Sequence, residues 1–316
     1  MKTWNKDHLI DRLKKEGLVF SNFSLVHEGN YAVDDADWNY KDVPHLHYVH
    51  ELVEAVYAAM QDEFIATINI QKVFGFRMPL CVFNYQSGKD EQTYYTSWLF
   101  FTLIVHTCYE KIAENKTRVI TTYYVGSSTI LKWCFPFIRY AIRKNYKNLM
   151  LADIPMRERR GKLRELGYQF YKSTESYSFP KTMEILEQNV IIRPVSLGQY
   201  TININDVLAL DGEYFHGKDD HLGIRLVRQK NELFIFARMC LHEGASLDRG
   251  KCIGMKIQCP WHGRLHAPLA KFTVNDPMIQ KVESKYCNLE LSGNVLTVAE
   301  KNFITKPIAC EEEVTI

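Results

Sequence analysis

Cys240-Leu-His242 and, after sixteen intervening residues, Cys259-Pro-Trp-His262 form the most informative stretch of this sequence. Two thiols and two imidazoles in paired loops indicate a metal site, and either zinc or a 2Fe-2S cluster fits such a donor set. Structural zinc sites usually pair Cys with Cys and His with His. Here each loop supplies one of each, which favours a cluster in which one iron holds both thiolates and the other both imidazoles. A zinc knuckle is the alternative.

The wider segments 240–247 and 259–263 resemble the two cluster-binding loops of Rieske proteins. This resemblance implies that a 2Fe-2S cluster is held by Cys240, His242, Cys259 and His262. In the Rieske proteins of respiratory chains, a disulfide ties the loops together and a Ser after the second-loop Gly raises the potential. Ala245 and Arg264 stand at the corresponding positions here. We therefore expect a lower-potential cluster, below about 0 mV, of the kind that feeds oxygenases.

A second motif, Asn39-x2-Asp42-x2-His45-x4-His50, lies in the N-terminal half. It resembles the mononuclear-iron motif of Rieske non-haem iron oxygenases. Two His and one carboxylate on one face of Fe(II) leave the other face open for O2 and substrate. The resemblance implies that His45 and His50 are iron ligands. His47 is a rival, because His47 and His50 would share one helix face.

The third iron ligand is expected from an acidic residue far downstream. The segment Leu151-Ala-Asp153-Ile-Pro-Met-Arg-Glu158 resembles the family's segment there, which implies that Asp153 is the ligand and Glu158 the fallback. A helix N-cap is the alternative role of Asp153, since Asp caps helices well.

Asp42 takes a different role from the same resemblance. In the family, this Asp links a cluster-binding His of one subunit to an iron-binding His of the next, within a head-to-tail trimer. The resemblance thus implies a homotrimer in which Asp42 connects His262 or His242 to His45. The alternative is a plain N-cap for the helix that carries the His residues.

Composition sets the broad class. At 316 residues the chain is long enough for two domains, and 46% hydrophobic and 24% charged residues are ordinary for a globular protein. A net charge of +2 gives no electrostatic case for a nucleic-acid partner. The six remaining cysteines have no disulfide-framework spacing, which favours a reducing, cytoplasmic location. The polar start shows no signal peptide, and the most apolar run, residues 98–105, is far shorter than the ~20 residues of a membrane span, so it predicts a buried strand.

The N-terminal half predicts an α+β domain. We expect helices at residues 5–16 and 52–60, with a polar loop after the first. An antiparallel meander should follow, with strands at 64–70, 78–83, 92–105 and 118–125. A long helix is predicted from 127 to about 148 with a kink at Pro136, and a second from 153 to 166, closed by Gly167. This order resembles the START/Bet v 1-like helix-grip fold, which is the catalytic domain of Rieske oxygenases and encloses an apolar cavity.

The C-terminal half predicts an all-β Rieske domain. Short strands are expected at 190–192, 200–204, 223–227, 233–237, 256–258, 289–291 and 295–298. We therefore expect a catalytic helix-grip domain in residues 1–170, a linker in 171–189 and a Rieske domain in 190–316. This order reverses the usual one of the family.

The resemblance implies a terminal oxygenase that hydroxylates an apolar aromatic, steroid or lipid-like substrate with O2. Its electrons would come from NAD(P)H through a separate ferredoxin or reductase, since no G-x-G-x-x-G motif follows a strand here. Monooxygenation, dihydroxylation and demethylation share one iron site. The competing hypothesis is a Rieske electron-transfer protein fused to an iron-free lipid- or polyketide-binding domain.

Three further features are interpreted as having no functional role. The run 157–164, rich in Arg, is expected to be a solvated helix face rather than a docking site for an acidic ferredoxin. His106 is expected to be a satisfied core residue rather than part of the cavity wall. His266 is assigned no role.

Overall fold

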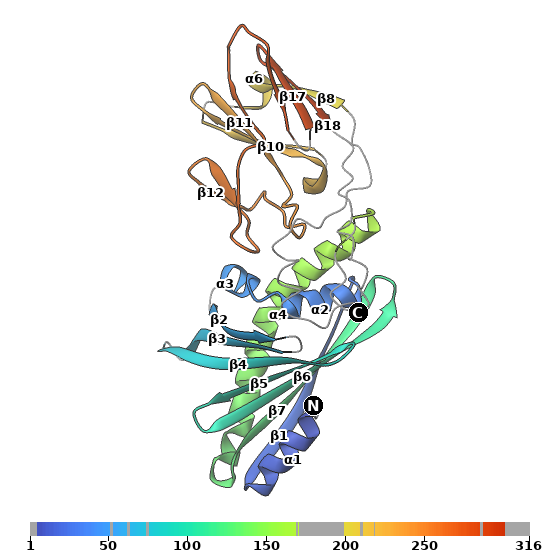
Figure 1. Cartoon of the computed structure of the whole chain (residues 1–316), viewed down its shortest axis with the longest axis vertical. Helices are drawn as coiled ribbons and strands as arrows, with labels where there is room; N and C mark the ends of the chain where they lie inside the picture. The colour runs from blue at the N-terminus through green and yellow to red at the C-terminus, as the bar shows by residue number, and fades with distance from the viewer. Residues whose placement is uncertain are drawn as a thin grey trace, which may run out of the picture. The chain divides into compact units, whose positions relative to one another are not determined.

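The computed structural model describes residues 5–50, 53–61, 64–73, 76–168, 170, 199–208, 211–217, 219–284 and 287–300. The chain divides into two compact units (Figure 1). The first comprises residues 1–162 and 172–187, and the second comprises 163–171 and 188–316. Residues 171–189, predicted as the linker, and the strand expected at 190–192 lie outside the described residues.

The first unit is an antiparallel sheet with a long helix, as predicted, but the sheet has seven strands where four were expected. The sheet order is β1-β7-β6-β5-β4-β3-β2. Its strands are β1 (Leu18–Gly29), β2 (Val53–Gln61), β3 (Phe64–Val73), β4 (Phe76–Gly88), β5 (Glu91–Trp98), β6 (Phe101–Ala113) and β7 (Lys116–Ser128). Helices α1 (Lys6–Lys15), α2 (Val33–Lys41) and α3 (His45–Val49) surround it, and α4 (Phe135–Glu165) runs along it (Figure 1). This arrangement is the START-like helix-grip fold.

Two segments of this sheet were predicted wrongly as other structure. Residues 18–29, expected to be a polar loop, form β1, which pairs with β7 along its whole length. Residues 53–60, part of a stretch expected to be a helix, lie in β2, which pairs with β3. The apolar spacing of this second segment fits a helix and a strand equally well, and backbone pairing with a neighbouring strand decides between the two.

The apolar run 98–105 is a hairpin rather than one buried strand. Trp98 pairs with Phe101, and the turn between them places Leu99 at a φ of 51°. Leu99 and Phe100 are 71% and 73% exposed. Hydrophobicity alone conceals this turn, because it lacks the Asn or Gly that usually marks a two-residue hairpin loop.

The two predicted helices are one. A short 3-10 helix, η1 (Thr129–Cys134), leads into α4, which is continuous for 31 residues. Pro136 is the second residue of α4. In the first turn of a helix the backbone N–H has no intrahelical partner, so a proline there does not kink the helix. The predicted end is confirmed: Gly167 has a φ of 88°, and Tyr168 N–H bonds back to the carbonyl of Leu163.

The second unit is the predicted all-β domain. It contains three sheets, ordered β15-β11-β10-β9, β12-β13-β14 and β16-β17-β18-β8. Their strands are β8 (Gln199–Asn203), β9 (Glu213–His216), β10 (Ile224–Gln229), β11 (Glu232–Ala237), β12 (Lys251–Ile253), β13 (Lys256–Gln258), β14 (Leu265–His266), β15 (Ala270–Thr273), β16 (Gln280–Glu283), β17 (Cys287–Ser292) and β18 (Val295–Glu300).

The core of this unit joins two of the sheets. Fully buried aliphatic side chains such as Leu226, Leu233 and Leu296 pack in one cluster. The two Cys-His loops lie outside this core: one follows β11, and the other joins β13 to β14. Their own hydrogen bonds hold them in position. Among the helices in the described part of the chain, none is both long and apolar enough to cross a bilayer.

Candidate metal centres

The two Cys-His loops of the second unit share one backbone pattern. In the first loop, Cys240 N–H bonds to the Ala245 carbonyl at 2.8 Å, and Gly244 N–H returns to the Cys240 carbonyl at 2.9 Å. In the second, Cys259 N–H bonds to the Arg264 carbonyl at 2.7 Å, and Gly263 N–H returns to the Cys259 carbonyl at 2.9 Å. Each loop therefore closes on itself around its own Cys.

Glycine is needed at the turn of each loop. Gly244 has a φ of 83° and Gly263 a φ of 68°, values that favour glycine. A Cβ on Gly244 would also lie 2.5 Å from Leu163 Cδ1. The loops are thus closed by backbone geometry that other residues adopt only with strain.

Buried arginines fix the first loop to the domain. Arg225 Nη1, on β10, donates to the carbonyl of Leu247 at 2.8 Å and to that of Gly250 at 3.1 Å. Arg238 forms a two-bond pair with Asp248, at 2.9 and 2.6 Å. Such two-bond pairs combine strength with fixed orientation. The first loop is therefore clamped at both of its ends.

The four predicted cluster ligands converge. Cys240 and Cys259 are fully buried, and His242 and His262 are 3% and 9% exposed. The two Nδ1 atoms lie 3.1 Å apart, close to the spacing of about 3.4 Å expected for two imidazoles on one tetrahedral iron. A hydrogen bond between the two thiols lowers the pKa of Cys259 and raises that of Cys240. This donor set fits a cluster that takes thiolates on one side and imidazoles on the other.

His266 approaches the same thiols, although no sequence motif assigned it a role. A ring nitrogen of His266 and the sulfur atoms of Cys240 and Cys259 all lie within 4.8 Å of one another. The contact with His266 also contributes to the low pKa of Cys259. The only signal in the sequence was that His266 lies four residues after His262. That spacing shows that it is near the second loop in sequence but not that it contacts the thiols.

The second centre lies in the first unit, where the structure brings His45, His50 and Asp153 together. His45 begins α3, His50 follows α3 directly, and Asp153 lies inside α4. Asp153 Oδ1 is 2.9 Å from His50 Nε2 and 3.5 Å from His45 Nε2. Three ligands on one face of an octahedral ion, with bonds of about 2.1 Å, lie about 3 Å apart. Both distances to Asp153 Oδ1 are close to this spacing, and all three ligand atoms lie within 4.8 Å of one another.

These atoms are buried and lack ordinary hydrogen-bond partners. His45, His50 and Asp153 are 2%, 7% and 7% exposed. Within the part of the chain that the structure describes, no well-formed hydrogen bond reaches Nε2 of either His or Oδ1 of Asp153. Buried polar atoms of this kind are costly unless something binds them. A divalent cation between the three would satisfy all of them.

The electrostatics of this centre also fit a cation. Burial alone would raise the pKa of Asp153, but the two imidazoles and Arg157 outweigh burial and hold it well below its usual value. Burial likewise opposes the charged form of His45, but Asp153 and Asp42 outweigh it and raise the pKa of His45 to about 9. The carboxylates of Asp42 and Asp153 thus favour a positive charge at this centre. Protonation of His45 supplies that charge when no metal is bound.

Asp42 contacts His45 within its own chain. It is the C-terminal cap residue of α2, and its Oδ2 lies 3.6 Å from His45 Nδ1, which also contacts the Asp42 carbonyl oxygen. The residue that caps the N-terminus of α3 is Pro44, so the N-cap role considered for Asp42 is wrong. Because Nδ1 faces Asp42, Nε2 of His45 faces Asp153.

The rival ligands lie elsewhere. His47 is exposed and packs edge-on against Tyr48, with ring centroids 4.8 Å apart. Glu158 Oε1 accepts from the backbone N–H of Asn30 at 3.5 Å. Asp153 itself lies in the middle of α4, which excludes the N-cap role considered for it.

Arg157 organises a polar layer behind this centre. It is fully buried, its Nε donates to Asn39 Oδ1 at 2.8 Å, and its Nη2 lies 3.8 Å from Asp153 Oδ2. Its Nη1 donates to His27 Nε2 at 3.1 Å, and His27 Nδ1 lies 2.5 Å from the Tyr146 hydroxyl. Burial and Arg157 lower the pKa of His27 to about 4, so the ring is neutral and can accept.

The prediction of a solvated face for residues 157–164 is therefore wrong. Arg160 is fully buried as well, with Nε 2.9 Å from Asp35 Oδ1 and the guanidinium stacked on Trp38 at 4.1 Å. Four arginines in eight residues suggested exposure, but the two that face inward have buried partners. Arg160 pairs with Asp35 on α2, and Arg157 contacts Asn39 and Asp153. The acidic run at 34–37 was the sequence signal that could have revealed this.

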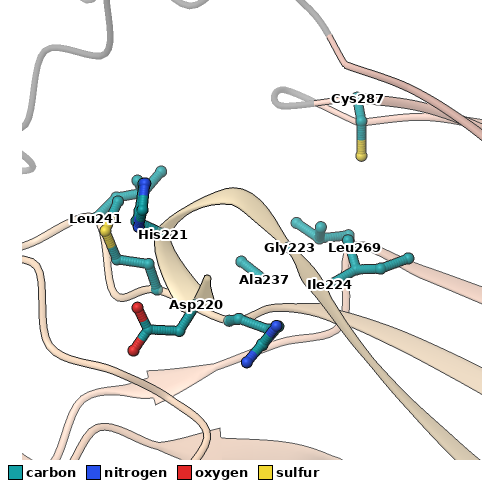
Figure 2. A pocket seen from close by; sticks show the side chains of 10 residues that line it. Asp220, His221, Gly223, Ile224, Ala237, Leu241, Leu269 and Cys287 are labelled. Atoms are coloured by element: carbon teal, nitrogen blue, oxygen red, sulfur yellow. The ribbon is translucent and has the colours of Figure 1, made fainter. Parts of the chain in front are cut away.

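A pocket in the second unit lies beside the first cluster loop. It is formed in part by Met239 and Leu241, which flank Cys240, together with Asp220 and His221 (Figure 2). Figure 2 shows the His221 ring next to Leu241 on this wall. The pocket belongs to the cluster domain and not to the His45–Asp153 centre.

Comparison with known proteins identifies the second unit. Residues 203–284 match the family described as the Rieske 2Fe-2S domain. The second unit is therefore a Rieske domain, and this implies a 2Fe-2S cluster. No curated protein matches the chain.

Several solved structures are similar to the chain. A START superfamily protein from Mycobacterium smegmatis has 9% identity and a TM-score of 0.38 over 43% of this chain and 97% of that one. Zhui aromatase/cyclase from Streptomyces sp. R1128 has 9% identity and a TM-score of 0.41, over 45% and 96%. Dicamba monooxygenase bound to 3,6-dichlorosalicylic acid has 12% identity and a TM-score of 0.38, over 53% and 58%.

Proposed function

We propose that this chain is the terminal component of a Rieske non-haem iron oxygenase. It would hydroxylate an apolar substrate with O2 and electrons from NAD(P)H, delivered by a separate ferredoxin or reductase. One observation carries the proposal: His45, His50 and Asp153 form a buried cluster of metal-binding atoms in a chain that also contains a Rieske domain.

The residues present divide the work between them. An Fe(II) ion held by His45, His50 and Asp153 would supply O2 activation on its open side. Asp42 orients the His45 ring so that Nε2 faces Asp153. Arg157 keeps Asp153 ionised and in place. Burial around all of them excludes bulk water from the reacting oxygen.

The four loop residues Cys240, His242, Cys259 and His262 would hold the cluster through which electrons arrive. We propose that Asp42 continues this path by linking a cluster-binding His of a neighbouring subunit to His45 in a homotrimer. A carboxylate that already contacts one imidazole can accept a hydrogen bond from a second. The Asp42 side chain is fully buried in its own chain, so this link requires the subunit contact to open the region around it.

An apolar substrate is supported by the face of the sheet that carries these groups. Tyr123 is 9% exposed and stacks on Phe23, with ring centroids 5.2 Å apart. Tyr94, on β5, hydrogen-bonds through its hydroxyl to the Tyr40 carbonyl at 3.3 Å. Phe100 does not belong to this face, because it lies in the exposed turn after β5.

Iron content tests the proposal against a pure electron carrier. Anaerobic reconstitution with Fe(II) should give about three irons per chain, two in the cluster and one at His45, His50 and Asp153. Asp153→Ala should fall to about two while its Rieske absorption and electron paramagnetic resonance spectra stay unchanged. A wild-type value of about two after reconstitution would overturn the oxygenase and favour the carrier with an iron-free helix-grip domain.

His47→Ala is the matched control. It lies two residues from His45, removes the same imidazole and is exposed, so its iron content should remain at about three. Product analysis of the reconstituted protein with aromatic, steroid and lipid substrates would then identify the substrate class.

A further inference from the structure

A third group of metal-binding side chains lies on the sheet of the first unit and shares no residue with the other two centres. Glu91 on β5 and His106 and Cys108 on β6 offer one carboxylate oxygen, one imidazole nitrogen and one sulfur within 4.8 Å of one another. In the strand register, Glu91 pairs directly with Cys108. Directly paired residues of an antiparallel pair point to the same face, so the sheet itself brings the three together.

The two distances from the imidazole are close to those of a coordination tetrahedron. His106 Nε2 lies 3.2 Å from Cys108 Sγ and 3.8 Å from Glu91 Oε2. Zinc bonds of about 2.0–2.3 Å place neighbouring ligand atoms roughly 3.3–3.7 Å apart. A cation would therefore reach all three atoms with small side-chain adjustments.

Hydrogen bonds outside the group orient the imidazole for such a role. The Thr93 hydroxyl donates to Ser87 Oγ at 3.1 Å and lies 3.0 Å from His106 Nδ1. Because its proton goes to Ser87, Thr93 accepts from Nδ1–H, and the lone pair of His106 is on Nε2. That atom is the one that faces Cys108 and Glu91. Partners of this kind fix the tautomer of histidines that bind metals.

The group lies on the opposite face of the sheet from the His45–Asp153 centre. Tyr109, next to Cys108 in β6, packs with Tyr31 and Ala36 on the α2 side. His106 and Cys108 alternate with it and point to the other face. The His106 side chain is 11% exposed and that of Glu91 46%, so a fourth, water-filled position would open on the Glu91 side. Lys6 of α1 acts on His106, and it is paired with Asp7 at 3.2 Å.

We propose that Glu91, His106 and Cys108 form a binding site for a divalent transition metal of the zinc class. Sulfur, imidazole and carboxylate donors together suit Zn(II). In the metal-free protein the Cys108 thiol donates to His106 Nε2, and binding replaces that proton with the cation, which leaves the sulfur as a thiolate. The site is independent of the proposed oxygenase activity.

Protection of Cys108 from alkylation tests this site. The full-length protein is treated with iodoacetamide with and without Zn(II), and each cysteine is quantified by peptide mass spectrometry. At a Zn(II) concentration ten times the dissociation constant, alkylation of Cys108 should slow about tenfold. Cys134 has intermediate exposure like Cys108 but lies in no such group within the described residues, so its rate should stay the same.

Two variants assign the effect. His106→Gln should abolish the protection of Cys108, and Glu91→Gln should weaken it, whereas His47→Gln should leave it intact. As a second readout, Co(II) should give a thiolate charge-transfer band in a difference spectrum of the wild type that is lost in Cys108→Ser. The site is refuted if Zn(II) does not slow Cys108 relative to Cys134, or if protection persists without His106.

Discussion

The two main centres are built in opposite ways. The cluster loops span residues 240–264, and each is closed by two backbone hydrogen bonds around its own Cys. The His45–Asp153 centre joins α3 to a residue more than a hundred positions later, and only the packing of α4 on the sheet brings them together. A local site depends on turn geometry, whereas a long-range site depends on the buried contacts of a helix. Variants that disturb one kind of support should leave the other centre intact.

Removal of Asp153 should have the largest effect. Asp153→Ala deletes one of three metal-binding side chains, and turnover should fall by about 10³-fold or more because the remaining pair of imidazoles cannot hold iron in place. Product formation under saturating reductant measures the loss. The control is His47→Ala, with turnover near that of the wild type. Full activity of Asp153→Ala would remove this residue from the site.

Breaking the buried pair behind the centre should come next. Arg160→Ala removes the guanidinium that neutralises the buried Asp35 carboxylate, which should destabilise the first unit by about 3–5 kcal/mol. Lys162→Ala, on the same helix but exposed, should cost less than about 0.5 kcal/mol. Denaturant unfolding followed by far-UV circular dichroism measures both, while visible absorption reports the cluster. Loss of the cluster at the same denaturant concentration would contradict the separation of the two supports.

The same contrast explains what could be predicted from the sequence. The cluster loops were visible because ligands and turn glycines stand within a few residues of one another. Asp153 was predicted as a ligand only from a resemblance to a known family. The polar layer behind it, formed by His27, Arg157 and Tyr146, was not predicted. No local pattern distinguishes a buried arginine from an exposed one when its partners are far away in sequence.

The fold followed the same rule. The antiparallel sheet, the end of α4 at Gly167 and the all-β second unit were predicted correctly, because strand composition and helix caps are local signals. The turn at Leu99, the strand β1 and the continuity of α4 were not, because each is decided by pairing or packing with a distant segment. Residue spacing alone cannot report a strand's partner.

A glycine substitution tests the local support at moderate strength. Gly244→Ala places a side chain at a φ of 83° and 2.5 Å from Leu163, and should destabilise the second unit by about 1–3 kcal/mol. Gly254→Ala shares the left-handed backbone, with a φ of 58°, but its Cβ meets no atom within 4 Å. Gly254→Ala therefore shows the cost of the left-handed backbone alone. The difference in stability between the two variants measures the cost of the contact with Leu163. Thermal loss of the visible cluster spectrum is the readout, and equal shifts would rule out the Leu163 contact.

The smallest expected effect concerns pH and the layer behind the iron centre. Burial and Arg157 lower the pKa of His27 from 6.5 to about 4. In the unfolded chain, His27 therefore becomes protonated below about pH 6.5, whereas in the folded protein it becomes protonated only near pH 4. Stability from this group is fully present above pH 6.5 and declines as the pH falls toward 4, by about 1–2 kcal/mol once the ring's partial exposure is allowed for. His27→Gln keeps an acceptor for Arg157 but cannot titrate, so its unfolding free energy should decline less over this range. Denaturant unfolding of both proteins from pH 7 to 4 measures the difference, and parallel curves would show that His27 is already protonated at neutral pH or equally so in both states.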